Sequence, residues 1–237
     1  MTQTNTNSSA KSGMALTCWH CGDRTPDGQF CMGCGKIQPL PPGTDYFALI
    51  GLPPKLQIDA DALEHRFHQL SWKLHPDNFV RASDLERNVS LDRSSQLNDA
   101  YRTLREPVSR VEYLLRQRGV RKEGTSKQQA PPELLEEVFE LNESLDELRS
   151  ARRSGDGHLA ELRHKLEAAQ HNFESKLGEV DAQLQSVFAE WDSAIDASAG
   201  EDTQRKLMDR LNEILNRRSY IRNLVANVQQ ELTGEER

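Results

Sequence analysis

Residues 131–233 constrain the fold most, because their apolar side chains recur at α-helical spacing in three successive runs. The runs extend from Leu134 to Leu148, from Leu159 to Trp191 and from Leu207 to Leu232. Each run predicts a helix with one buried stripe. A turn with two glycines at 154–157 separates the first two runs and favours chain reversal. We therefore expect an all-α fold that ends in an antiparallel three-helix bundle, with a parallel coiled-coil dimer as the alternative.

The composition fits elongated helical packing and argues against several classes of function. The 237 residues include 30 basic and 37 acidic side chains, a formal charge of -7, and only 36% are hydrophobic. The basic residues are scattered, which argues against a protein that binds nucleic acid by neutralising phosphates. No run approaches the roughly 18 to 20 apolar residues that cross a bilayer, and residues 1–15 read as a disordered polar tail without a leader pattern. We expect a cytoplasmic protein with no membrane partner.

All four cysteines lie within one short segment, as Cys18-x2-Cys21 and Cys31-x2-Cys34. Two such pairs suit a tetrahedral site with four thiolate ligands, which favours structural zinc in a module over residues 16–38. The glycine after each pair, Gly22 or Gly35, suits a tight turn with positive φ. The alternatives are two disulfides, a redox dithiol, or His20 as a replacement ligand. A reducing cytoplasm and the absence of a βαβ pattern favour zinc.

Four helices are expected between a proline-rich linker at 39–44 and residue 119. Asp45 is a candidate N-cap for the first, and the predicted ranges are 46–50, 59–74, 84–106 and 108–119. Proline disfavours helix at the residue before it, so His75-Pro76-Asp77 is predicted to be a loop. We expect six apolar side chains of the second and third helices to form core rather than contacts with a partner: Leu63, Phe67, Leu70, Leu97, Tyr101 and Leu104.

An exposed imidazole beside a carboxylate suggests acid-base chemistry, but the sequence offers little else for catalysis. It has no recognisable nucleophile, phosphate-binding glycine loop or third orienting residue, so we do not expect an enzyme. The residues alone leave open that His75 and Asp77 are ordinary surface residues in a turn.

The order helix, helix, HPD loop, helix resembles a J-domain, here spanning residues 45–119. Four further segments make the resemblance specific to the HscB family of iron-sulfur co-chaperones, over about residues 45–233. They are Asp45-Tyr46-Phe47, Gly51-Leu52-Pro53, Leu97-Asn98-Asp99-Ala100-Tyr101 and Arg110-Val111-Glu112-Tyr113. The cysteine segment resembles the extended, zinc-carrying form known from animal relatives. Asn78 departs from the lysine that often follows the HPD in J-domains.

The resemblance implies how the J-domain acts. In this family the loop His75-Pro76-Asp77 stimulates ATP hydrolysis by a seventy-kilodalton-class heat-shock chaperone of the HscA or DnaK type. Basic residues of the preceding helix meet an acidic patch of that chaperone. Arg66 and Lys73 are the matching positions here, although each could instead be an ordinary solvated residue.

Two apolar pairs in the bundle lie off its stripes. Leu135 and Phe139 are rotated by about 100° from Leu134 and Val138, and Tyr220 and Leu224 form a second such pair. Each pair could cover the edge of the bundle or form a surface for a partner. The resemblance implies that six residues of the bundle bind the iron-sulfur scaffold protein IscU: Leu134, Leu135, Val138, Phe139, Tyr220 and Leu224.

The expected function is therefore a co-chaperone of iron-sulfur cluster assembly, with a J-domain for the chaperone and a bundle for the scaffold. One alternative is a general J-domain protein-folding co-chaperone, which we would expect to carry a glycine- or methionine-rich region for clients. Another is a redox protein that uses the four cysteines, which the zinc-like spacing disfavours.

Overall fold

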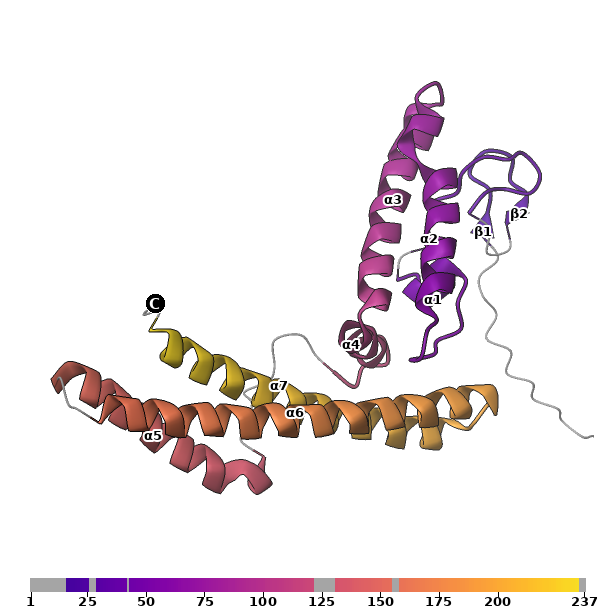
Figure 1. Ribbon diagram of the computed structural model, residues 1–237. Helices are drawn as coiled ribbons and strands as arrows, with labels where there is room; N and C mark the ends of the chain where they lie inside the picture. Colours follow the sequence, from indigo (N-terminus) through magenta and orange to yellow (C-terminus); the bar gives the residue numbers. More distant parts are fainter. Residues whose placement is uncertain (1–15, 26–28, 42, 122–130, 155–157, 235–237) are drawn as a thin grey trace, which may run out of the picture. The chain divides into compact units, whose positions relative to one another are not determined.

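The structure is a computed structural model that describes residues 16–25, 29–41, 43–121, 131–154 and 158–234. Figure 1 shows a chain built mainly of helices, as expected. The predicted tail at 1–15, most of the polar stretch at 121–130 and the glycines at 155–157 lie outside the described residues. The elements are β1 (Leu16–Thr17), β2 (Arg24–Thr25), α1 (Tyr46–Ile50), α2 (Ala60–Leu74), the 3-10 helix η1 (Pro76–Phe79), α3 (Asp84–Arg105), α4 (Pro107–Gln117), the 3-10 helix η2 (Pro132–Leu134), α5 (Leu135–Ser154), α6 (Leu159–Asp196) and α7 (Glu201–Thr233).

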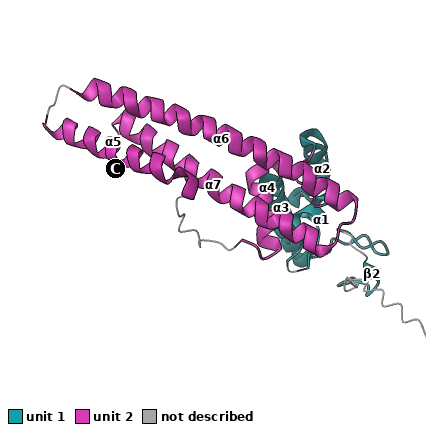
Figure 2. Cartoon of the chain, turned by 90° about the horizontal axis from the view of Figure 1, so that it is seen from below, with its two compact units in different colours: residues 1–53, 59–104 teal, residues 54–58, 105–237 magenta. Residues whose placement is uncertain are grey.

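The chain forms two compact units, coloured separately in Figure 2. The first contains residues 1–53 and 59–104, and the second contains residues 54–58 and 105–237. The predicted J-domain, 45–119, thus takes α1 to α3 from the first unit and α4 from the second.

Helices α1 and α2 begin and end where their capping residues predict. The side chain of Asp45 accepts a hydrogen bond from the backbone N–H of Phe47. Gly51 ends α1 with a φ of 76°, a left-handed conformation that glycine adopts without strain. Asp59 caps α2 by accepting from the N–H groups of Asp61 and Ala62.

The predicted core of α2 and α3 is largely confirmed. Leu63, Leu97 and Leu104 are buried, and Leu70 is half-buried. Phe67 and Tyr101 are half-buried and stack on one another, with ring centroids 4.2 Å apart and planes 18° from parallel. This stack joins the middle of α2 to the C-terminal half of α3.

The cysteine segment contains a small antiparallel hairpin, which its sequence did not predict. Leu16 pairs with Thr25 and Thr17 with Arg24, so β1 and β2 frame the first cysteine pair. Phe30 and Ile37 form an isolated bridge around the second pair. Each strand has only two residues, too few to show the alternation of apolar side chains that identifies a strand in a sequence.

In the second unit, α6 packs along α7 and also against α5. Arg210 pairs with Glu190 at 2.7 Å and Arg218 with Asp181 at 2.5 Å, so residue numbers rise along α7 as they fall along α6. The two helices are therefore antiparallel, as predicted. Stripe residues from all three helices form the core, including Leu141, Leu145, Leu148, Phe173, Leu184, Trp191, Leu211, Ile221 and Val228.

The short loop at 54–58 belongs to the second unit and is fastened to α6. The buried carboxylate of Asp192 accepts hydrogen bonds from the backbone N–H groups of Leu56, at 2.6 Å, and Gln57, at 2.9 Å. The indole N–H of Trp191 donates to the Pro54 carbonyl at 2.9 Å. These bonds give a buried polar side chain its partners within the core of the bundle.

Among the described residues, no helix is both long and apolar enough to cross a membrane.

Candidate functional site

The four cysteines converge on one point. In each pair, the N–H of the following glycine donates to the carbonyl of the first cysteine, Gly22 to Cys18 at 3.0 Å and Gly35 to Cys31 at 2.8 Å. Both glycines have positive φ, as predicted. The two tight turns bring all four Sγ atoms within 4.8 Å of one another. Two of the Sγ–Sγ distances, Cys18 to Cys34 and Cys21 to Cys31, are 3.6 Å.

These distances fit a tetrahedral metal site. Metal–sulfur bonds of about 2.3 Å separate the sulfurs of a tetrahedron by about 3.8 Å, close to the observed spacing. The cysteines are not paired in disulfides. The cluster can therefore bind a metal ion with Cys18, Cys21, Cys31 and Cys34 as ligands.

The surroundings of Cys18 favour its thiolate form. Burial raises the pKa of the Cys18 thiol, but hydrogen bonds from the backbone N–H groups of Cys21 and His20, and from neighbouring thiols, lower the pKa to about 6. The N–H of His20 lies 3.3 Å from Cys18 Sγ, and the side-chain amide of Gln38 lies at the same distance. Thiolate is the form that binds a metal ion.

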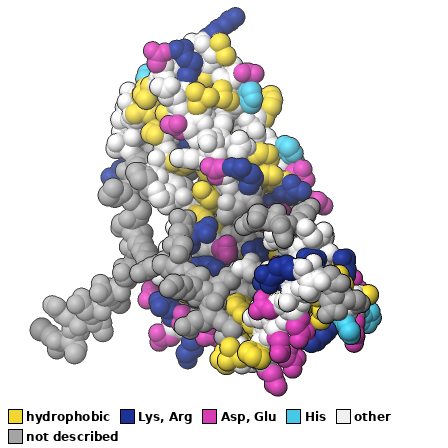
Figure 3. Space-filling model, turned by 90° about the vertical axis from the view of Figure 1, so that its left-hand side faces the viewer, with side chains coloured by type: hydrophobic (Ala, Val, Ile, Leu, Met, Phe, Trp, Pro, Cys, Tyr) yellow, Lys and Arg dark blue, Asp and Glu magenta, His cyan; other side chains and the backbone are white. Residues whose placement is uncertain are grey.

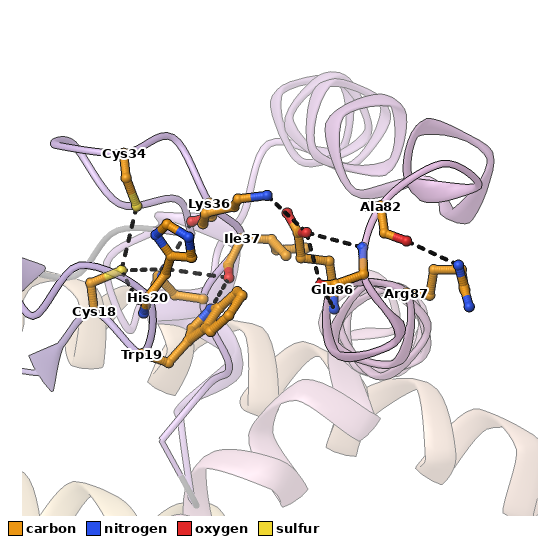
Figure 4. Close-up of polar contacts among 11 residues, drawn as sticks. Cys18, Trp19, His20, Cys34, Lys36, Ile37, Ala82, Glu86 and Arg87 are labelled. Atoms are coloured by element: carbon orange, nitrogen blue, oxygen red, sulfur yellow. Dashed lines mark hydrogen bonds and ion pairs between the residues drawn. The ribbon is translucent and has the colours of Figure 1, made fainter.

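The cysteine segment is joined to α3 by two charged contacts. Figure 4 shows Lys36 reaching Glu86, whose carboxylate lies 2.9 Å from the Lys36 ammonium. The same carboxylate accepts from the backbone N–H and hydroxyl of Ser83, so Glu86 also closes a capping box at the start of α3. The buried Arg93, 1% exposed, donates to the carbonyl of Gln38 at 3.0 Å.

Neither of these α3 residues was predicted, although the sequence carries a signal for each. Ser83-x-x-Glu86 is the capping-box pattern. Arg93 stands four residues before Leu97 and four after Val89, so it lies on the apolar stripe of α3. A charged residue at such a position has to find a polar partner inside the fold.

The predicted loop His75-Pro76-Asp77 forms the exposed turn after α2, and Pro76 begins η1. The imidazole Nδ1 of His75 accepts a hydrogen bond from the N–H of Asp77 at 3.3 Å and lies 3.5 Å from the Asp77 carboxylate. Helix α3 holds the base of the turn: the hydroxyls of Ser90 and Ser94 donate to the Leu74 carbonyl at 2.7 and 3.1 Å. The turn therefore exposes His75 and Asp77 to solvent from a backbone held by α3, while Pro76 is half-buried.

Asn78, the residue that departs from the common pattern, is part of this turn. Its side-chain amide donates to the carbonyl of Trp72 at 2.7 Å. This bond ties η1 to the last turn of α2, where the final carbonyls of a helix lack partners of their own. The departure thus has a structural role.

The two predicted basic residues of α2 differ in their surroundings. Lys73 is exposed in the last turn of α2, next to the loop. Arg66 is also exposed, but its guanidinium donates to the carbonyl of Gly51, at the end of α1. Part of the hydrogen-bonding capacity of Arg66 is therefore used within the fold.

The six residues predicted for the scaffold differ widely in exposure. Leu135 and Phe139 are 55% and 71% exposed on α5. Tyr220 and Leu224 on α7 are half-buried, and Leu134 and Val138 are buried. Of the four predicted residues in η2 and α5, Leu135 and Phe139 can therefore contact a partner directly, whereas Leu134 and Val138 are buried.

Asn142 and Asp146 continue the face on which this pair lies, and Glu136 and Glu140 flank it at about 100° around the helix. Glu136, Glu140, Asn142 and Asp146 are all exposed on α5. Figure 3, which shows one face of the molecule, has hydrophobic side chains exposed among acidic and basic ones. An apolar contact with a polar rim is typical of a protein-binding surface.

Comparison with known proteins points to a single family. A family model described as the HSCB C-terminal oligomerisation domain matches residues 130–229. The iron-sulfur cluster co-chaperone protein HscB of Mus musculus is 34% identical over 172 residues, which cover 70% of this chain and 71% of the mouse protein. A co-chaperone protein HscB homolog of Vibrio campbellii is 35% identical over 164 residues, or 69% of this chain and 88% of the relative.

A solved structure agrees with the sequence matches. The crystal structure of human co-chaperone protein HscB superimposes with a TM-score of 0.62 at 27% identity. The match covers 93% of this chain and 100% of the human one.

Proposed function

The chain belongs to the HscB family of iron-sulfur cluster co-chaperones, and from this premise we propose that it couples two partners. The loop His75-Pro76-Asp77 stimulates the ATPase of a seventy-kilodalton-class chaperone of the HscA or DnaK type. The bundle binds the iron-sulfur scaffold protein IscU and delivers it to that chaperone. In this proposal the chain has no enzymatic activity of its own and works in the cytoplasm.

The observation that carries the proposal is the exposed HPD turn held from below by α3. The serine hydroxyls of α3 bond the Leu74 carbonyl, and Asn78 bonds the Trp72 carbonyl, so the backbone of the turn is fixed. A prearranged loop loses little conformational entropy when it binds. His75 and Asp77 are then available to a partner, and Lys73 adds a positive charge beside them.

The scaffold site is proposed on α5, around Leu135 and Phe139. Exposed leucine and phenylalanine side chains at successive turns offer an apolar contact that the fold itself does not use. Tyr220 and Leu224 extend the proposed site to α7. We also propose that residues 45–119 act as the J-domain and residues 131–233 as the scaffold-binding bundle.

The metal is proposed to be zinc. Four thiolates in tetrahedral spacing suit this ion and leave no open coordination position, so its role is structural. When bound, zinc cross-links the two cysteine turns, and Lys36, Gln38, Glu86 and Arg93 connect those turns to α3.

The experiment that tests the proposal asks whether the chain bridges its two partners. The purified chaperone with ATP and labelled IscU are sedimented with and without this protein. We expect IscU to migrate with the chaperone at least tenfold more when the chain is present. Equal co-migration without the chain would contradict the adaptor role. A chain that stimulates the ATPase with unfolded polypeptides but does not bind IscU would favour the general folding co-chaperone.

A further inference from the structure

The outward face of α2 carries an unusually exposed tryptophan. Trp72 is 80% exposed, whereas Leu63 and Leu74 on the opposite side of the helix are buried. Counting about 100° per residue places Trp72 near the centre of the outward face. Gln69 and His65 lie on that face, one and two turns before Trp72, and are also exposed. Trp72 therefore makes little contribution to the core of the first unit.

The charges around Trp72 are few. His68 lies 3.5 Å from Glu64, and the imidazole of His65 is within 2.9 Å of the Gln69 amide. Arg66 and Lys73 stand at one edge of the face, and Arg66 already donates to the Gly51 carbonyl. A partner that approached this face through charge alone would thus depend mainly on Lys73.

Trp72 is physically continuous with the HPD turn. The Asn78 amide bonds the Trp72 carbonyl at 2.7 Å, and Asn78 follows Asp77 directly. Two residues separate Trp72 from His75 along the chain. The backbone that carries the indole is therefore tied to the turn, so a protein bound at the turn can also reach the indole.

We propose that Trp72 is the apolar anchor of the chaperone contact, inserted into an apolar pocket of the chaperone whose rim is acidic toward Lys73. This inference rests on the proposed function and adds a residue that determines the strength of binding. Tryptophan is enriched among the few residues that supply most of an interface's energy, and an aromatic side chain can bury about 150 to 250 Å². The anchor compensates for the small number of unpaired cations on α2.

The test compares Trp72→Ala with Trp72→Phe in chaperone ATPase titrations, using the full chain and the purified seventy-kilodalton chaperone. For Trp72→Ala we expect at least a tenfold rise in the concentration that gives half-maximal stimulation. The maximal stimulation should persist, because the HPD turn is intact. Trp72→Phe should recover most of the affinity. Leu91→Ala is the matched control, since it removes another exposed apolar side chain, on α3, and should change nothing.

Added salt distinguishes the apolar contribution of Trp72 to binding from the contribution of the charged residues. Salt should weaken wild type and Trp72→Ala in parallel, because burial of an indole is not screened. Trp72→Ala could leave the concentration for half-maximal stimulation unchanged while His75→Gln abolishes stimulation. This result would contradict the role of Trp72 as an anchor but not the proposed function. If His75→Gln also stimulates normally, the proposed function itself is wrong.

Sedimentation of the chain alone completes the test. We expect the same mass for wild type and Trp72→Ala. A dimer that Trp72→Ala dissociates would show that the indole faces a second copy of this chain, which would overturn the chaperone contact.

Discussion

Removing Leu135 and Phe139 together should separate binding from folding. Phe139 is 71% exposed and Leu135 is 55% exposed, so folding buries less than a third of the first and less than half of the second. Full burial of such side chains contributes about 1.5 to 3 kcal/mol each. Scaled by the buried fractions, Leu135→Ala with Phe139→Ala should cost about 1 to 2 kcal/mol of unfolding free energy. For a chain of this size that lowers Tm by a few degrees.

Leu141→Ala supplies the comparison. Leu141 is buried on the same helix, and truncating a core leucine typically costs about 2 to 5 kcal/mol. Thermal unfolding followed by circular dichroism should therefore give Leu141→Ala a lower Tm than the double mutant.

Binding of IscU should be weaker in the double mutant than in Leu141→Ala, the reverse of the order in stability. Titration with IscU should give at least a tenfold higher Kd for the double mutant, about 1.4 kcal/mol, as expected for apolar anchors of an interface. Leu141→Ala, measured well below its melting temperature, should bind nearly as wild type. If the double mutant melts as low as Leu141→Ala, the pair belongs to the core. If neither Tm nor Kd changes, the scaffold binds elsewhere.

Three further outcomes are expected. Elemental analysis should find about one zinc per chain, and iron or no metal under reducing conditions would contradict the zinc assignment. Cys31→Ser should lose the zinc and also lower the Tm of the first unit, because the cysteine turns pack against α3. The hydrogen bond from Lys36 lowers the pKa of Glu86 below its ordinary 4.5, so the ionised carboxylate stabilises the fold above that pH, and this stabilisation is lost as pH falls through the lowered pKa. The difference in unfolding free energy between wild type and Glu86→Gln should therefore shrink on acidification, and a constant difference would refute this. Lys73→Ala should weaken the chaperone contact in a salt-dependent way, by about 0.2 to 1 kcal/mol measured from the concentration that gives half-maximal stimulation. Equal effects of Lys73→Ala at low and high salt would exclude the electrostatic role. Arg66→Ala should also lower Tm, because its bond to the end of α1 is lost.

The helices were predictable because each leaves a local signal. Asp45 and Gly51 limit α1 at both ends, and Asp59 and the proline after His75 limit α2. The stripes of the bundle repeat over many turns, so α5, α6 and α7 coincide with the predicted runs, with ends that differ by at most six residues. Such signals depend only on neighbours in the sequence.

Contacts between distant polar residues were not predictable in the same way. Asp192 bonds the backbone of Leu56 and Gln57 across more than a hundred residues, and no periodicity marks that pairing. The attachment of the cysteine turns to α3 through Lys36 and Glu86 is of the same kind. The proline-rich linker suggested a separate module, whereas these contacts place the module in the first unit.

In the candidate site, too, features with a local signal in the sequence were predictable and features that depend on packing were not. The cysteine spacing predicted a cluster that the structure confirms, because the ligands come from two local turns. The HPD sequence predicted a loop for an equally local reason. Exposure of individual side chains needed the structure: Leu134 and Phe139 are both apolar residues at the start of the bundle, yet one is buried and the other open to solvent.

In the proposed function, the chain joins a chaperone to a scaffold through separate surfaces. His75→Gln tests it most directly, because His75 is exposed and lies far along the sequence from Leu135 and Phe139. The measurement is ATPase stimulation of the chaperone at saturating co-chaperone, with the Kd for IscU determined on the same preparation. We predict that stimulation is lost while Tm and the Kd for IscU stay at their wild-type values. Stimulation by His75→Gln equal to that of wild type would contradict the account.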